Sequence, residues 1–138
     1  MKVAILDAQG AGLGKTLIKK IRKDIPSNIY LIALGTNPIA TSNMLNAGAN
    51  EGITGEEAIC RFCQSNYIDC IIGPIGIISS GGIKGEITSS ISQAVFELNC
   101  TKYIIPIKKH GIYIPGTQNL KIKDFMNEII LNIKDKFL

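Results

Sequence analysis

Short apolar runs alternate with amphipathic helical segments along nearly the whole chain. The runs 2–6 (KVAIL), 29–34 (IYLIAL), 68–72 (IDCII) and 102–107 (KYIIPI) are rich in Ile and nearly free of charged residues. Strands that are buried on both faces have this composition, and they occur in parallel sheets covered by helices. The alternation therefore predicts an α/β fold, a three-layer Rossmann-like and mostly parallel sheet with helices on both faces.

The segments between these runs carry helix signals. In the first segment five apolar residues recur at helical spacing before a proline, namely Leu13, Leu17, Ile18, Ile21, Ile25 and then Pro26. Asn37 is suited to cap a second helix that starts at Pro38. Further helices are expected over 55–65, 88–99 and 120–137, and a brief edge strand over 50–54. The strand 102–107, the turn KKHG and the run 112–114 predict a C-terminal antiparallel hairpin.

The size and composition of the chain exclude several classes of protein. With 138 residues, it has the length of one domain, 1–138, and its 46% hydrophobic residues argue against disorder. A net charge of +4 is spread over dispersed lysines, which does not indicate a nucleic-acid partner. An apolar run long enough for a membrane span is absent, and the start of the chain is no signal peptide, so we expect a cytoplasmic protein. Cys60 and Cys63 form a CxxC without a second pair, so we expect reduced thiols and no metal.

The loop after the first run, DAQGAGLGKT (7–16), resembles two kinds of phosphate-binding loop. Its candidate ligand residues are Gln9, Gly10, Ala11, Gly12, Leu13, Gly14, Lys15 and Thr16. Glycines let a backbone approach a phosphate closely, and the helix that follows directs free N–H groups and its positive dipole end at the anion. The alternative is a tight strand-to-helix turn that needs its glycines only for packing.

Neither phosphate-loop pattern is complete. The P-loop pattern GxxxxGK[ST] has its second half in Gly14, Lys15 and Thr16, but Gln9 stands where the first glycine belongs. The GxxxGxG pattern of short-chain dehydrogenase-like domains is a closer resemblance, with Ala8 in place of its first glycine. The Tyr-xxx-Lys pair of those enzymes is absent, so hydride transfer by their mechanism is not expected.

Two further segments are expected at the same rim of the sheet, because the carboxyl ends of parallel strands share one edge. Gly35, Thr36 and Asn37 follow the second run, and they are neutral where a dinucleotide site has an acid. Gly73, Pro74, Ile75 and Gly76 follow the run 68–72, and the glycine-rich loop 79–88 could close over a ligand. Asp7 and Glu86 are the acid/base candidates, and Lys84 is a candidate electrostatic clamp. The lone histidine, His110, is expected to be a solvated turn residue.

Taken together, these motifs make the chain resemble the bacterial family called domain of unknown function 3842. The resemblance rests on the segments 7–15, 33–50, 54–59, 71–78 and 85–88, and it extends over essentially the whole chain. It implies a Rossmann-like fold and a cytoplasmic bacterial protein, and it implies no activity.

Three hypotheses about function follow from the residues. The first is a protein that binds a phosphate-bearing ligand, a nucleotide or dinucleotide, with NAD(P) or another adenine nucleotide as the expected cofactor. The second is a small lyase, isomerase or transferase that acts on a phosphorylated metabolite. The third is a regulatory or scaffold subunit whose cradle is empty. A homo-oligomer is compatible with all three, because edge strands invite pairing.

Overall fold

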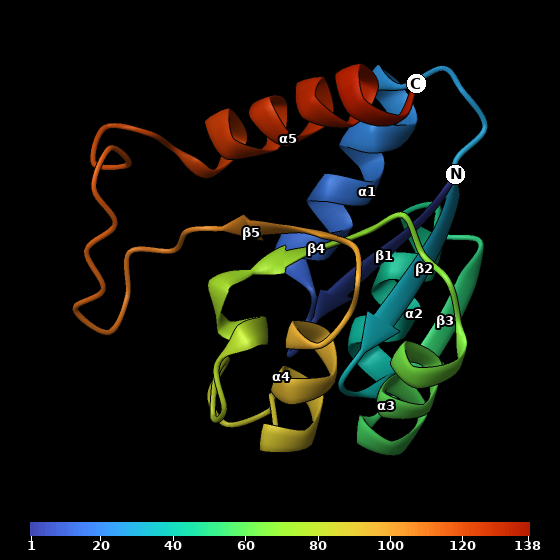
Figure 1. Cartoon of the computed structure of the whole chain (residues 1–138), viewed down its shortest axis with the longest axis vertical. Helices are drawn as coiled ribbons and strands as arrows, with labels where there is room; N and C mark the ends of the chain where they lie inside the picture. Colours follow the sequence, from blue (N-terminus) through green and yellow to red (C-terminus); the bar gives the residue numbers. More distant parts are fainter.

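A computed structural model describes all 138 residues and places a five-stranded parallel sheet at the centre of the molecule (Figure 1). In chain order the strands are β1 (Lys2–Asp7), β2 (Tyr30–Gly35), β3 (Glu51–Thr54), β4 (Cys70–Pro74) and β5 (Thr101–Ile105). They lie in the order β3-β2-β1-β4-β5, and every neighbouring pair is parallel. The predicted α/β sheet is confirmed, including the short edge strand β3.

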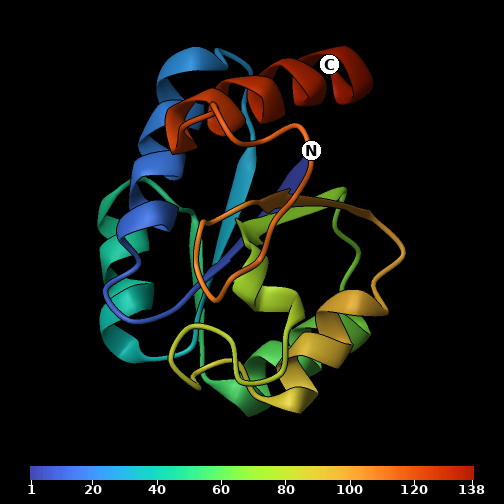
Figure 2. The ribbon, with the colours of Figure 1, turned by 90° about the vertical axis from the view of Figure 1, so that its left-hand side faces the viewer.

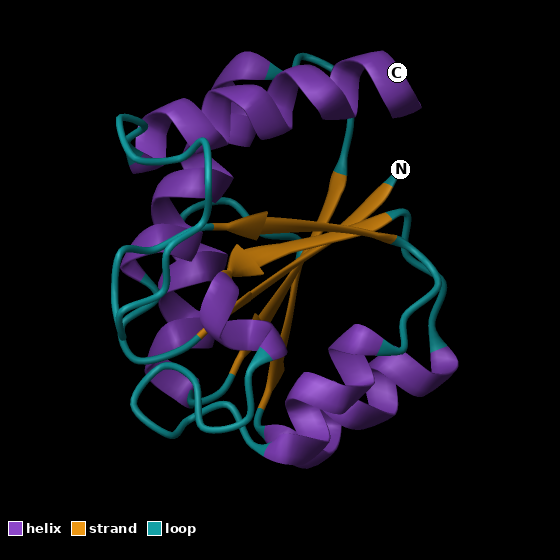
Figure 3. Cartoon of the chain, turned by 60° about the vertical axis from the view of Figure 1, so that its left-hand side comes forward, coloured by secondary structure: helices purple, strands orange, loops and turns teal.

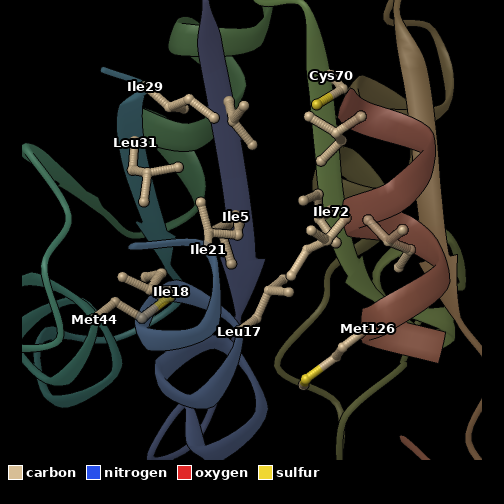
Figure 4. Close-up of a cluster of buried hydrophobic side chains, with 14 of the residues drawn as sticks. Ile5, Leu17, Ile18, Ile21, Ile29, Leu31, Met44, Cys70, Ile72 and Met126 are labelled. Carbon is tan, nitrogen blue, oxygen red and sulfur yellow. The ribbon is translucent and has the colours of Figure 1, made fainter. Parts of the chain in front are cut away.

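Helices cover both faces of this sheet. On one face α1 (Gly12–Asp24), α2 (Pro38–Asn46) and α5 (Ile122–Phe137) enclose a cluster of 20 buried residues, part of which Figure 4 shows around Ile5, Leu17 and Ile72. On the other face α3 (Glu56–Ser65) and α4 (Ser89–Phe96) enclose a second cluster of 12, around Leu34 and Ile71. None of the helices is both long and apolar enough to cross a membrane.

The helices begin where the sequence indicates. The Asn37 side chain accepts a hydrogen bond from the Ala40 N–H at 2.9 Å, and Thr88 accepts one from the Ile91 N–H at 3.2 Å. These bonds satisfy N–H groups that a helix start leaves free, so both residues act as N-caps, as was predicted for Asn37. The five strands alternate with the five α-helices along the chain, and the carboxyl ends of all strands point to the same edge of the sheet (Figure 3).

The predicted C-terminal hairpin is wrong. No strand follows β5, and residues 106–121 form turns that project beyond the sheet (Figure 1). His110 and Gly111 have left-handed φ values of 59° and 68°, and the Ile112 N–H bonds the carbonyl of Lys109, so the chain coils instead of pairing. Pro106 and Pro115, which lack the N–H that a strand ladder needs, bracket this stretch.

The thiols are free and lie in or against the core. Cys70 is buried, and Cys60, Cys63 and Cys100 are half-buried against the second cluster. Burial raises the pKa of Cys63 to about 11 and that of Cys70 to about 12. Both thiols therefore stay protonated at neutral pH and are poor nucleophiles.

Candidate functional site

A cavity of about 360 Å³ opens at the carboxyl edge of the sheet, between the loops that follow β1, β4 and β5. Figure 2 shows two of these segments, the yellow-green loop before α4 and the orange segment after β5, on the same side of the molecule. The lining consists of residues 7–13, 74–76, Ser79, 82–84, Ile107, Lys109, His110 and Ile112. The volume lies at the lower end of the range for small-molecule sites.

The glycine loop presents free donors to this cavity. The Gly14 N–H donates to Asp7 Oδ2 at 2.8 Å, and the Lys15 N–H donates to the Ala11 carbonyl at 2.8 Å. The N–H groups of Gly10, Gly12 and Leu13 donate no hydrogen bond within the protein, and all three residues line the cavity. Three free N–H groups at the positive end of α1 can donate hydrogen bonds to an anion.

Packing does not require glycine at two of the three positions in this loop. A Cβ atom added to Gly14 would lie 2.8 Å from Met44 Sδ and 3.2 Å from Asp7, so this glycine is needed for packing. A Cβ atom at Gly10 or Gly12 would meet no atom within 4 Å, and neither residue has a left-handed φ. The alternative of a turn with glycines for packing alone therefore explains Gly14 but leaves Gly10 and Gly12 unexplained.

Backbone strain is concentrated around the same cavity. Five non-glycine residues have a left-handed φ, between 51° and 59°: Gln9, Ala11, Ile83, Lys84 and His110. All five line the cavity. Each such residue costs roughly 1–3 kcal/mol, and strain of this kind gathers at ligand sites in proteins. The unfavourable backbone conformations of the non-glycine residues are therefore concentrated at the lining of this cavity.

Glu86 ties three segments together behind the glycine loop. Its Oε1 accepts hydrogen bonds from the Gln9 N–H at 3.0 Å, Thr36 Oγ1 at 2.7 Å and Asn37 Nδ2 at 2.9 Å. Burial acts to raise the pKa of Glu86, but these three hydrogen bonds outweigh it and hold the pKa below the ordinary value of 4.5. Glu86 is thus an ionised structural tie, and it does not line the cavity.

Asp7 is the carboxyl group that does line the cavity. It is buried, with Oδ1 accepting from the Ala8 N–H and Oδ2 from the Gly14 N–H, both at 2.8 Å. Burial raises the pKa of Asp7 above its ordinary value, while the two backbone N–H groups act to lower it. Lys84 and Lys109, which are exposed at the lining, bring positive charge to the same space.

The structure divides the residues that the sequence singled out. Residues 9–13, Pro74, Ile75, Gly76, Asp7 and Lys84 line the cavity, and Gly14 packs against Asp7 beneath it. Lys15 is exposed outside the lining, and the hydroxyl of Thr16 donates to the Gly12 carbonyl. Gly35, Thr36, Asn37, Gly73 and Glu86 also lie outside the lining.

Sequence reasoning missed the third wall of the cavity. Ile107, Lys109, His110 and Ile112 line it, although His110 was expected in a solvated hairpin turn. The available signal was the position of KKH just after the apolar run 102–107, because the carboxyl ends of parallel strands meet at one edge.

Comparison with known proteins decides the family. Residues 2–138 match the family described as domain of unknown function 3842. The chain belongs to that family. The glycine loop and the whole lining of the cavity fall inside the matched region, so the site is part of the domain that defines the family. No curated protein matches the chain.

Among solved structures, the chain is similar to the crystal structure of a dodecameric FMN-dependent UbiX-like decarboxylase from Escherichia coli O157:H7. The sequence identity is 12%, the TM-score is 0.53, and the similarity covers 99% of this chain and 94% of that one. A likeness at this level of identity shows a shared parallel α/β fold.

Proposed function

We propose that this protein binds a nucleotide in the cavity between the β1, β4 and β5 loops. The observation that carries the proposal is the set of free N–H groups at Gly10, Gly12 and Leu13 beside that cavity. A phosphate group would accept hydrogen bonds from these donors at the positive end of α1. The base or ring of the ligand would then lie against the apolar residues of the lining.

The remaining lining fits such a ligand. Outside the β1 loop, its apolar residues come from the β4 loop and the segment after β5, namely Pro74, Ile75, Ile83, Ile107 and Ile112. Lys84 and Lys109 bring positive charge to the lining, and no acid other than Asp7 is among the lining residues. An apolar wall with a few polar groups at one end is the usual composition of a small-molecule site.

The ligands to test include flavin as well as adenine nucleotides. The structurally similar Escherichia coli protein is FMN-dependent by its description, and the shared fold supports including FMN in the panel. Within this proposal we assign acid/base chemistry to Asp7 and the electrostatic clamp to Lys84, because both candidates line the cavity and Glu86 does not. The raised pKa of the buried Asp7 carboxyl favours it as a proton acceptor or donor in this space.

Self-association is the second part of the proposal. Residues Tyr67, Phe96 and Tyr113 are 77%, 71% and 69% exposed, and both edge strands, β3 and β5, lack a partner on their outer side. Such features favour contacts between copies. Sedimentation of the purified protein should give a mass that is a multiple of the 14.9 kDa chain, and a monomer at all concentrations contradicts this part.

The experiment that tests binding is thermal unfolding in the presence of AMP, ATP, NAD, NADP, FMN, FAD or inorganic phosphate. A ligand at 100 times its Kd adds about 2.7 kcal/mol to the free energy of unfolding, a rise of several degrees in Tm for a chain of this length. At least one nucleotide should raise Tm, and Gly12→Asp should abolish the rise. If no nucleotide raises Tm, the proposal is wrong.

The chain offers a matched control for this variant. Gly12 and Ser89 are each the first residue of a helix, α1 and α4, and both are exposed. An acid in the first turn is favourable to either helix, so neither Gly12→Asp nor Ser89→Asp should unfold the protein. Ser89→Asp should leave ligand binding intact, because Ser89 is not part of the lining.

A further inference from the structure

We propose that Glu86 restricts this site to mononucleotides by occupying the place where the second half of a dinucleotide would lie. The inference rests on the proposed nucleotide binding and specifies which class of nucleotide the cavity accepts. It concerns the rim of the sheet beside β2, which the glycine loop separates from the cavity.

The position of the cavity is the first step. In an open parallel sheet a dinucleotide lies across the point where the strand order reverses, with one ribose held by an acid at the end of the second strand. Here β1 is flanked by β2 and β4, so a dinucleotide would reach both sides of the β1 loop. The cavity, however, is lined only from β1, from the β4 loop and from the segment after β5. No residue of the loops that directly follow β2 and β3 contributes to the lining.

The end of β2 is already occupied, which is the second step. Thr36 directly follows β2, and its hydroxyl donates to Glu86 Oε1. Asn37 donates from Nδ2 to Glu86 Oε1 and to the Gln9 carbonyl, and it accepts from the Ala40 N–H. The polar groups that could meet a second ribose or phosphate are therefore engaged within the protein, with a carboxylate placed among them.

The third step is that Glu86 is not easily displaced. Its backbone N–H donates to the Ile83 carbonyl at 3.1 Å, and the Ile87 N–H next to it donates to the Gly82 carbonyl at 3.0 Å. Gly82 itself lies so close to Gly76 that a Cβ atom would be 2.1 Å from the Gly76 carbonyl oxygen. Moving Glu86 out would therefore disrupt a tightly packed turn.

The test uses two pairs of probes that share a mononucleotide half. AMP is contained in NAD, and FMN is contained in FAD, so each pair differs only by the additional nucleotide. Calorimetric titration of the wild-type protein should give, for the pair that binds, a Kd for the mononucleotide at least about tenfold below that of the dinucleotide. Glu86→Ala should bring the two values within about threefold of each other by improving dinucleotide binding.

Glu86→Gln is the matched control, because its side-chain oxygen can still accept from Gln9, Thr36 and Asn37. This variant should keep the preference for the mononucleotide. A wild-type protein that binds NAD or FAD as tightly as its mononucleotide overturns the inference and leaves nucleotide binding intact. A Glu86→Ala protein that folds and retains the full wild-type preference also overturns it. A wild-type protein that binds none of the four probes overturns the proposed function itself. If Glu86→Ala does not fold, the ratio of the wild-type Kd values for dinucleotide and mononucleotide still tests the inference.

Discussion

The backbone N–H of Gly14 donates to the carboxylate of Asp7 at 2.8 Å, so the last residue of β1 binds the first turn of the helix that the same loop introduces. This bond closes the base of the glycine loop and leaves the N–H groups of Gly10, Gly12 and Leu13 facing no partner within the protein. The loop is thus fixed by the bond between Gly14 and Asp7, while its other N–H groups remain available to a ligand. Several outcomes can be predicted from this arrangement.

Replacing Asp7 should destabilise the fold. Asp7→Ala leaves the Ala8 and Gly14 N–H groups without an acceptor, and a buried unpaired donor costs roughly 1–3 kcal/mol. Asp69→Ala is the matched control, because Asp69 accepts from the backbone N–H of the exposed Lys2, and its loss should cost less than about 1 kcal/mol. Urea unfolding of both variants measures the difference. Equal losses in the two variants would show that the bond to Gly14 has no special weight.

Asp7 and Glu86 should give opposite pH dependences of stability. Burial raises the pKa of Asp7 in the folded state, so its contribution is largest below the ordinary value of 3.8 and is lost as the pH rises through the folded pKa. The pKa of Glu86 is lowered, with its hydrogen bonds outweighing burial, so its contribution is present above 4.5 and is lost as the pH falls through the folded pKa. The free energy of unfolding of wild type minus Asp7→Asn should decrease with rising pH, and that of wild type minus Glu86→Gln should increase. The same sign for both differences would contradict the assignment.

The glycines of the loop should separate into two kinds. Gly14→Ala places a methyl group 2.8 Å from Met44 Sδ, within a buried contact, and overpacking of this kind costs about 1–3 kcal/mol. Gly10→Ala meets no atom within 4 Å and should change the free energy of unfolding by less than about 0.5 kcal/mol. Thermal unfolding distinguishes the two. A Gly10→Ala protein as unstable as Gly14→Ala would contradict the prediction that a methyl group at Gly10 meets no neighbouring atom.

Relief of strain at the cavity should increase stability while weakening the site. Lys84 is exposed and has a φ of 52°, so Lys84→Gly removes a left-handed conformation and should add about 0.5–1 kcal/mol. The same change removes a cation from the lining and should weaken nucleotide binding. Lys84→Arg keeps both the charge and the strain, and we expect it to resemble the wild type in both assays. A Lys84→Gly protein that is less stable than Lys84→Arg would contradict the strain argument.

The architecture could be predicted from sequence because each element carries a local signal. KVAIL and IDCII have the composition of buried strands, and Asn37 and Thr88 are placed to cap the helices that they do cap. The prediction for the segment 106–121 was wrong because IYI has the composition of a strand. The conformation of the segment depends instead on the left-handed residues at 110 and 111, and Ile112 lines the cavity. A short apolar run alone does not distinguish a strand from a turn that packs on a site.

The site was predictable only in part. The rim of the sheet brings together the β1 and β4 loops, which sequence reasoning located from their glycines. The tie through Glu86 could not be read from the sequence, because the partners of Glu86 are far away along the chain. The sequence separations are 77 residues to Gln9, 50 to Thr36 and 49 to Asn37. That tie turns Thr36 and Asn37, expected at the ligand, into partners of a protein carboxylate. On our proposal, the glycine loop serves one nucleotide, and Glu86 occupies the place beside β2 where a second would lie.

The most direct test is to follow the backbone amide resonances of the wild-type protein during titration with AMP and with FMN. We predict that the amides of Gly10, Gly12 and Leu13 shift together and saturate with a single Kd, because they would donate to the phosphate. The amide of Gly55, which donates to the Gly35 carbonyl at 2.9 Å, should stay unchanged. Saturating shifts confined to the α3 and α4 face, or no shift with either nucleotide, would contradict the account of the glycine loop as a phosphate cradle.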